Sequence, residues 1–289
     1  MSVTFSGGVV FADIESHGVG ELDTMPPEKF FRLGQWAIDE GQVRTTTDLD
    51  EFREVLLGAR MVVFANGIAF DIPAVFGDRW AAVRLAREGK LLDTHVFAMI
   101  ANPPPFGTFQ PYTGGKPLAC SKPEHFRKWI KLDQQAYSLG VIQKTGDIND
   151  IADRFAYHDE PVLTPKGKQA MSKGKPRMRK VANEGDFCCK YSLIPLDDPQ
   201  FVEYAERDVI VVREVARKQL ERHAWTPYAR TEMLKAALAT LIGHGNGFRA
   251  DVELARKRVE AQRAEALGVL TWLRDVHGFP FEPEDFDSE

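Results

Sequence analysis

The chain has 289 residues, of which 44% are hydrophobic and 27% charged, as is typical of a soluble globular protein. No apolar run approaches the ~20 residues that a membrane-spanning helix needs, and the N-terminus lacks the pattern of a signal peptide. Three cysteines without a CxxC pair argue against a disulfide framework and against a zinc site, so we expect a reducing, cytoplasmic location.

The net charge of −5 taken alone disfavours a nucleic-acid partner, but the charge is unevenly distributed. The segment from Thr164 to Lys180 has no acidic residue and seven basic ones: Lys166, Lys168, Lys173, Lys175, Arg177, Arg179 and Lys180. Two interpretations remain open, a solvated mobile loop and an arm that attracts phosphate. They are compatible, because a flexible basic loop can become ordered on a nucleic-acid backbone.

The N-terminal part alternates short apolar runs with helical patterns. The expected strands cover residues 8–14, 31–38, 42–47 and 61–65. Asp48 has the position of an N-cap for a helix through Ala59, and a second helix begins between Asn66 and Asp71. Asp93–Thr94 follows another expected strand and is predicted to cap a helix through Ile100.

The remaining sequence is expected to be mainly helical after a Pro- and Gly-rich loop. The loop covers 102–117, and helices are expected at 122–130, 138–144, 148–155, 198–222, 231–241 and 251–276. In the long helix, Phe201, Val209 and Val212 form an apolar stripe that includes either Tyr204 or Ala205. We therefore expect an α/β fold with a mixed sheet flanked by helices (residues 1–222) and a small helical annex (residues 223–289).

The pattern D-x-E occurs three times, at Asp13–Glu15, Asp251–Glu253 and Asp287–Glu289. Only the first follows a buried strand, where residues two apart project to the same face. The second lies at an expected helix start, where acidic residues are favoured by the helix dipole, and the third lies in a polar tail. Asp13 and Glu15 are therefore the candidates for a functional pair.

Two further motifs place acidic residues at the ends of elements. The first is Asn66-x-x-x-Phe70-Asp71, and the second is Tyr204-x-x-x-Asp208 on the long helix, where positions i and i+4 share a face. Taken singly, Tyr204 could be a core residue and Asp208 a surface acid. Several carboxylates that converge from different elements suit two Mg²⁺ or Mn²⁺ ions, which hydrolyse phosphodiesters in many nucleases.

In this order, the three motifs resemble Exo I (D-x-E), Exo II (N-x(2–3)-F/Y-D) and Exo III (Y-x3-D) of the DEDD exonuclease superfamily, and the tyrosine indicates the DEDDy branch. The phrases FANGIAFDIP, KLLDTHVFAMI and IPLDDPQFVEYAERDV are similar to the proofreading domains of bacteriophage family A (polymerase I type) DNA polymerases. The similarity covers about residues 8 to 222. It implies a ribonuclease H-like fold and, for a phage-encoded protein, the host cytoplasm.

The resemblance also implies roles for individual residues. Asp13 would bridge both metal ions, and Glu15 and Asp208 would complete the tighter site. Asp71 would hold the second ion through water, and Tyr204 would orient the attacking water. The residues expected to contact the nucleic acid are Asn66 near the primer terminus, Phe70, Val19 as a wedge, and the seven basic residues of 164–180.

The expected function is removal of nucleoside monophosphates from single-stranded or frayed DNA 3′ ends. Two alternatives remain: an RNA-processing exonuclease of the ribonuclease D type, and a non-catalytic DNA-binding module of a polymerase. The stretch from Leu234 to Asp251 resembles the lead-in to a polymerase thumb, but palm and fingers motifs do not occur in this sequence. A polymerase domain would therefore act in cis beyond these residues or bind in trans.

Overall fold

The computed structural model describes residues 3–105, 107–120, 122–142, 148–162, 171–172, 175–176, 178–183, 190–244 and 252–277. They form two compact units, Met1–Leu241 and Ile242–Glu289. The elements of the first unit up to the long helix are β1 (Val9–Ser16), η1 (Val19–Glu21), α1 (Pro27–Phe30), β2 (Phe31–Ile38), β3 (Arg44–Thr46), α2 (Leu49–Gly58), β4 (Met61–Phe64), α3 (Asp71–Phe76), α4 (Trp80–Arg87), β5 (Leu91–Asp93), α5 (Thr94–Ala101), β6 (Thr108–Phe109), β7 (Leu118–Ala119), α6 (Pro123–Trp129), α7 (Leu132–Leu139), α8 (Ile148–Ala156), β8 (Tyr157–Pro161), β9 (Met171–Ser172), β10 (Lys175–Pro176), β11 (Met178–Ala182) and η2 (Lys190–Leu193). The helices that follow are α9 (Pro199–Arg222), α10 (Pro227–His244) and α11 (Val252–His277).

The centre of the first unit is a mixed five-stranded sheet of order β3-β2-β1-β4-β5. β1 pairs antiparallel with β2 and parallel with β4, and β4 pairs parallel with β5. β1 is covered on both faces, so most of its side chains are buried and its sequence is an almost continuous apolar run. The expected α/β class with a mixed sheet flanked by helices is therefore confirmed.

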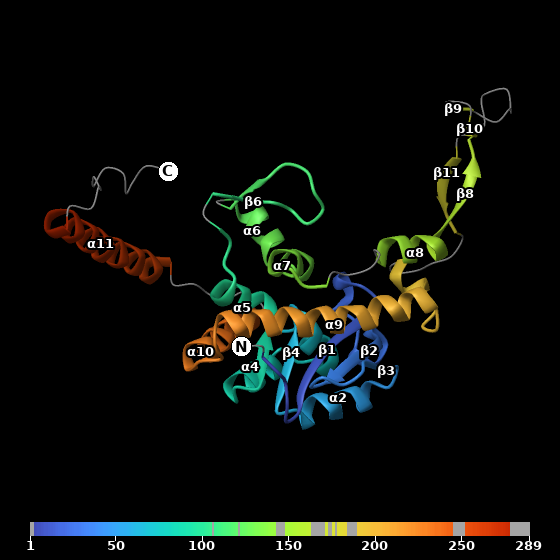
Figure 1. Ribbon diagram of the computed structural model, residues 1–289, viewed down its shortest axis with the longest axis horizontal. Helices are drawn as coiled ribbons and strands as arrows, with labels where there is room; N and C mark the ends of the chain where they lie inside the picture. The colour runs from blue at the N-terminus through green and yellow to red at the C-terminus, as the bar shows by residue number, and fades with distance from the viewer. Residues whose placement is uncertain are drawn as a thin grey trace. The chain divides into compact units, whose positions relative to one another are not determined.

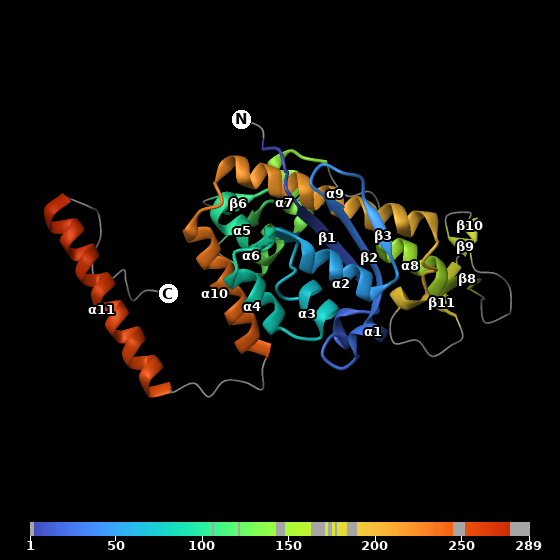
Figure 2. The same ribbon diagram turned by 90° about the horizontal axis from the view of Figure 1, so that it is seen from below.

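Helices cover both faces of the sheet: α9 lies across one face and α2 across the other (Figures 1 and 2). Asp48 caps α2 as predicted, because its carboxylate accepts hydrogen bonds from the backbone N–H groups of Asp50 and Glu51. Asp198 caps α9 by accepting from Phe201 N. The apolar stripe of α9 is fully buried and takes Ala205 rather than Tyr204 into the core.

An ion pair joins α9 to the turn after β2. The guanidinium of Arg217 donates to both carboxylate oxygens of Glu40 at 2.9 and 2.8 Å. Glu40 also accepts from the backbone N–H of Phe5 at 3.0 Å, and Arg217 lies over the Phe5 ring. The hydrogen bond from Arg217 is the main reason that the pKa of Glu40 falls to about 2, from an ordinary value of 4.5. The pair thus holds α9 against the chain entering β1.

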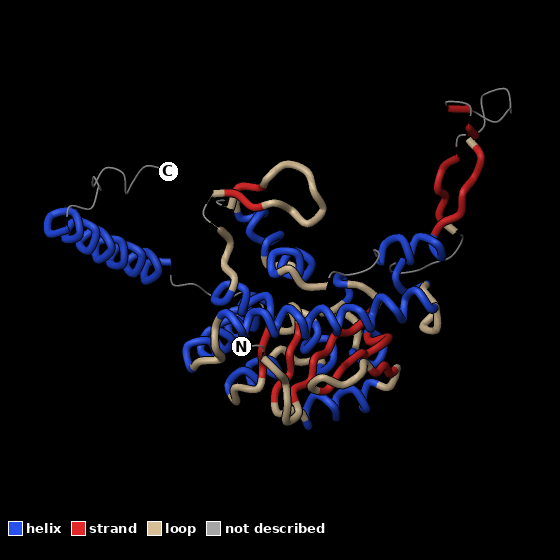
Figure 3. The backbone as a smooth tube through the Cα atoms, viewed as in Figure 1, coloured by secondary structure: helices blue, strands red, loops and turns tan. Residues whose placement is uncertain are grey.

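Most helices predicted in the second half of this unit (helices are blue in Figure 3) agree with the structure to within a few residues, but one helix and two segments predicted as loops differ. The helix expected at 138–144 is α7 and lies earlier, because Gly140 adopts a left-handed conformation and ends it. The segment 102–117 is not purely loop, since Thr108–Phe109 forms β6 and pairs antiparallel with β7.

The basic segment 164–180 is not a loop throughout. Lys175 lies in β10, and Arg179 and Lys180 lie in β11, which pairs antiparallel with β8. The backbone register pairs Arg179 with Glu160 and Lys180 with Asp159. Lys166, Lys168, Lys173 and Arg177 lie outside the described residues.

The first compact unit includes most of α10, which follows the expected domain boundary at residue 222. α10 packs against the sheet domain through Ala229, Met233 and Ala237, which are buried in the main core. The compact unit therefore continues to Leu241, and the second unit contains the last residues of α10 together with α11. None of the described helices is both long and apolar enough to cross a membrane.

We predict that Glu40→Gln lowers the free energy of unfolding by about 1 kcal/mol at pH 7, because the pair with Arg217 is partly screened by solvent. Since the folded-state pKa is depressed, this contribution is present above pH ~4.5 and is lost as the pH falls toward 2. Urea unfolding between pH 3 and 7 measures it. Glu54→Gln, at an exposed site on α2, serves as control, and a constant difference across this pH range would contradict the prediction.

Candidate metal centre

Three carboxylates meet where β1 and α9 cross. Asp13 and Glu15 are two residues apart on β1 and project to the face that α9 covers. Asp208 comes from α9, and one oxygen of each of the three side chains lies within 4.8 Å of the others. Glu15 and Asp208 are buried, Asp208 with only 4% of its surface exposed. This cluster could hold a metal ion, because hard divalent cations prefer such oxygen ligands.

The cluster opens into a cavity of about 300 Å³. Its lining combines the three carboxylates with aromatic and small residues: Asp13, Ile14, Glu15, Ser16, Gly18, Phe70, Ile148, Tyr191, Tyr204 and Asp208. Tyr204 precedes Asp208 by one turn of α9, so both side chains reach the same cavity. The structure thus brings together four of the five residues predicted to be catalytic.

Asp71, the fifth, lies beside the cluster but does not line the cavity. It begins α3 and is only 2% exposed. Burial is the main cause that raises the pKa of its carboxyl well above the ordinary value, and the negative charge of Asp13 raises it further. A bound cation would oppose both effects, because it favours the ionised form of nearby carboxylates.

The loop between β4 and α3 is held by a buried carboxylate. Asp93 accepts hydrogen bonds from the backbone N–H groups of Asn66 at 3.1 Å and Ile68 at 3.0 Å. It also caps α5 through His95 N, as expected from the sequence. Gly67 is required in this loop, because a Cβ there would lie 2.4 Å from the Cβ of Phe64. Asp93 therefore fixes the loop from which Phe70 and Asp71 project.

Gln35 is a site residue that sequence reasoning missed. It pairs with Asp13 in the β1–β2 ladder, and its amide donates to Asp13 Oδ2 at 2.9 Å. The side chain is completely buried, and its Oε1 atom has no hydrogen-bond partner in the described part of the chain. A glutamine inside the apolar strand FRLGQWAI was the available signal. Gln35 orients one carboxylate of the cluster.

The outer wall of the cavity was also missed, because it comes from segments far along the chain. Ile148 begins α8, and Tyr191 lies in η2. Arg32 of β2 fastens η2 by donating to the backbone oxygens of Tyr191 and Ile194. The hydroxyl of Tyr191 donates to Asn149 at 3.0 Å, which ties the two wall segments together.

The predicted nucleic-acid contacts are distributed unevenly around the cavity. Phe70 lines it and packs edge-on against Phe30. Asn66 is exposed, does not line the cavity, and has a left-handed backbone (φ 73°), which asparagine tolerates. Val19 begins η1, but its side chain lies outside what the structure describes, as do those of Lys175, Arg179 and Lys180.

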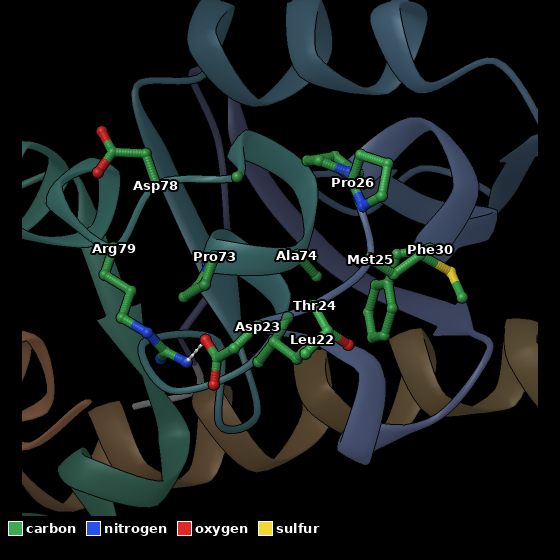
Figure 4. Close-up of a pocket in the computed structure, with 12 residues that line it drawn as sticks. Leu22, Asp23, Thr24, Met25, Pro26, Phe30, Pro73, Ala74, Asp78 and Arg79 are labelled. Carbon is green, nitrogen blue, oxygen red and sulfur yellow. Dashed lines mark hydrogen bonds and ion pairs between the residues drawn. The ribbon is translucent and has the colours of Figure 1, made fainter. Parts of the chain in front are cut away.

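A larger cavity, of about 560 Å³, is lined in part by α3 (Figure 4). Its lining includes Pro73 and Ala74 of α3 and the loop from Leu22 to Pro27, and it shares no residue with the cavity of the carboxylates. Arg79 donates to Asp23 at 2.6 Å, and Asp78, the other charged residue of the lining, accepts from Arg84 at 3.0 Å. The cluster of Asp13, Glu15 and Asp208 therefore belongs to the smaller of these two cavities.

Comparison with protein-family models gives no match, and comparison with curated proteins gives none either. The function of this centre is therefore inferred from its motifs and its geometry.

We predict that Gln35→Met weakens Mn²⁺ binding by about tenfold, because Asp13 loses the group that orients it. Isothermal titration of the metal measures this directly. Gln219→Met, at a buried glutamine of α9 that donates to Thr94 O, is the matched control and should leave Mn²⁺ affinity unchanged. Equal affinity of the Gln35 variant and the wild type would remove Gln35 from the site.

Proposed function

We propose that the protein is a metal-dependent 3′→5′ exonuclease that removes nucleoside monophosphates from single-stranded or frayed DNA 3′ ends. The observation that carries this proposal is the convergence of Asp13, Glu15 and Asp208 within 4.8 Å, with Tyr204 in the same cavity. Two of the three motifs, D-x-E and Y-x3-D, meet in this cavity, and Asp71 of the third motif is buried close enough to Asp13 to feel its charge, which supports a DEDDy active site.

The sheet supports the same proposal. Its strand order, with β2 antiparallel to the central β1 and β4 and β5 parallel to it, is compatible with a ribonuclease H-like fold. In such an arrangement the carboxylates of β1 and of the helix across it face each other. The position of Asp71 beside Asp13 fits the second motif of the superfamily.

The donor set fits two Mg²⁺ or Mn²⁺ ions. It consists of carboxylate oxygens without histidine or thiolate, which suits hard cations rather than zinc. When bound, two such ions would activate a water molecule and stabilise the leaving 3′-oxygen of a phosphodiester. Asp13, Glu15 and Asp208 would hold them, and Asp71 would contribute through water.

The remaining residues of the cavity would position the substrate. Tyr204 would orient the attacking water through its hydroxyl, since it lies one turn from Asp208 on α9. Phe70, whose ring lines the cavity, offers an apolar surface to the terminal base.

We predict that Asp13→Asn abolishes metal-dependent cleavage, because the cluster loses a carboxylate that would hold the metal. We predict that Tyr204→Phe lowers the rate constant of the cleavage step by about 100-fold. Single-turnover cleavage of 5′-labelled single-stranded DNA in Mg²⁺ measures both. Glu203→Gln, at an exposed position beside Tyr204, makes the same charge change as Asp13→Asn without touching the cavity and should retain full activity. Wild-type rates in the Asp13 variant would refute the assignment.

We also predict the direction in which the strand is cleaved and the preferred substrate. A 5′-labelled strand should shorten one nucleotide at a time, and a primer with a mismatched 3′ end should be cut faster than a matched one. A matched RNA strand tests the sugar preference, and we expect slower cleavage of RNA. Faster cleavage of RNA would indicate an exoribonuclease of the ribonuclease D type. Labelled products of intermediate length that appear before the products shortened by one nucleotide would indicate an endonuclease.

A further inference from the structure

A second basic region lies outside the segment 164–180. Between residues 102 and 132 there are five lysine and arginine residues and one acidic residue. Three of these, Lys116, Lys128 and Lys131, line one cavity of about 450 Å³ together with Tyr112 and Gln134. They come from three different places: the loop after β6, the end of α6, and the residue that precedes α7.

The floor of this cavity is held by an amide network. Gln134, which is buried, donates to the backbone oxygen of Gln110 at 3.0 Å and accepts from the backbone N–H of Tyr112 at 2.9 Å. The side chain of Gln110 donates in turn to Gly115 O at 3.1 Å. The loop that carries Tyr112 and Lys116 is therefore fixed to α7.

The three lysines have no opposite charge in the lining of the cavity. Lys128, in the last turn of α6, complements the helix dipole, but this does not account for Lys116 or Lys131. No ion pair of these three ammonium groups occurs among the described residues, and no acidic side chain lines the cavity. Three like charges around one hollow repel each other, and an anion placed there would relieve this repulsion.

An exposed aromatic ring stands beside the lysines. Tyr112 is 42% exposed at the cavity. Sites for single-stranded nucleic acids combine such aromatic surfaces, on which bases stack, with lysines that contact the phosphates. α7 packs against both α5 and α9, and α9 carries Tyr204 and Asp208, so the cavity and the carboxylate centre belong to one compact unit.

We infer that the cavity of Lys116, Lys128 and Lys131 binds the phosphate backbone of a nucleic-acid strand, with a base stacked on Tyr112. This inference rests on the proposed function in one respect: the bound strand is taken to be the substrate whose 3′ end enters the carboxylate centre. The site would bind the strand at a distance from the scissile bond. The affinity of this site would depend little on the sugar type or the base sequence of the strand.

The test compares two triple variants with the same change of net charge. In the first, Lys116, Lys128 and Lys131 become glutamine. In the control, the substituted lysines are Lys90, Lys218 and Lys235, each already paired with a glutamate at 3.0, 2.7 and 2.8 Å. Fluorescence anisotropy measures the affinity for a labelled 12-nucleotide DNA strand in EDTA, which prevents cleavage, at several salt concentrations.

We expect the first variant to bind about tenfold more weakly at low salt, with the slope of log K against log salt reduced by roughly 0.7 for each phosphate that a lysine no longer neutralises. The control should bind as the wild type does. Tyr112→Leu should weaken binding about fivefold, and Tyr112→Phe should not, because the ring is retained. Unchanged affinity in the first variant, or equal losses in both triple variants, would overturn the inference.

A small ester substrate distinguishes the role of this site from that of the carboxylate centre. Hydrolysis of thymidine 5′-monophosphate p-nitrophenyl ester in Mn²⁺ should be unchanged in the first variant, because this substrate has no strand to reach the lysines. Loss of this activity would show a disturbed fold and would overturn the inference, as would displacement of the DNA by thymidine monophosphate at equal affinity. If the wild type binds DNA through these lysines but cleaves neither substrate, the proposed function fails and this site remains.

Discussion

The packing of α9 against β1 is the interaction on which the rest of the structure depends. Phe201, Ala205, Val209 and Val212 form the buried stripe that fixes α9 on the sheet. Asp208 precedes Val209 directly, so the same packing that buries the stripe carries a carboxylate into the core beside β1. A shift of α9 by one residue would turn Asp208 away from Asp13 and Glu15, because successive helical residues point about 100° apart.

This arrangement places several acidic side chains where water cannot solvate them well. Like charges in a partly buried cluster repel each other, and burial disfavours the ionised form of each. The raised pKa of Asp71 shows both effects, with burial the larger. Such a cluster costs folding free energy, and a divalent cation is the counter-charge that would offset it. The cluster of Asp13, Glu15 and Asp208 could therefore bind a metal ion.

Residues outside the motifs hold the centre in shape. Gln35 orients Asp13 from the neighbouring strand, and Asp93 fixes the loop before Asp71 through backbone N–H groups. Arg32 fastens the segment that forms the far wall of the cavity. Each of the three side chains makes hydrogen bonds to specific partners and thereby sets the position of a carboxylate, a loop or a wall segment. Together these hydrogen bonds hold parts of the cavity wall in place.

The sequence by itself determined the alternation of strands and helices, the caps at Asp48 and Asp93, and the motifs that contain the candidate carboxylates, because these depend on local patterns of burial and backbone hydrogen bonding. It did not determine that Ala205 rather than Tyr204 enters the core, that Gln35 faces Asp13, or that three lysines surround one cavity. Those facts follow from strand register, helix rotation and the packing of segments distant in the chain. Only the tertiary structure sets these, since each depends on contacts that no local pattern encodes.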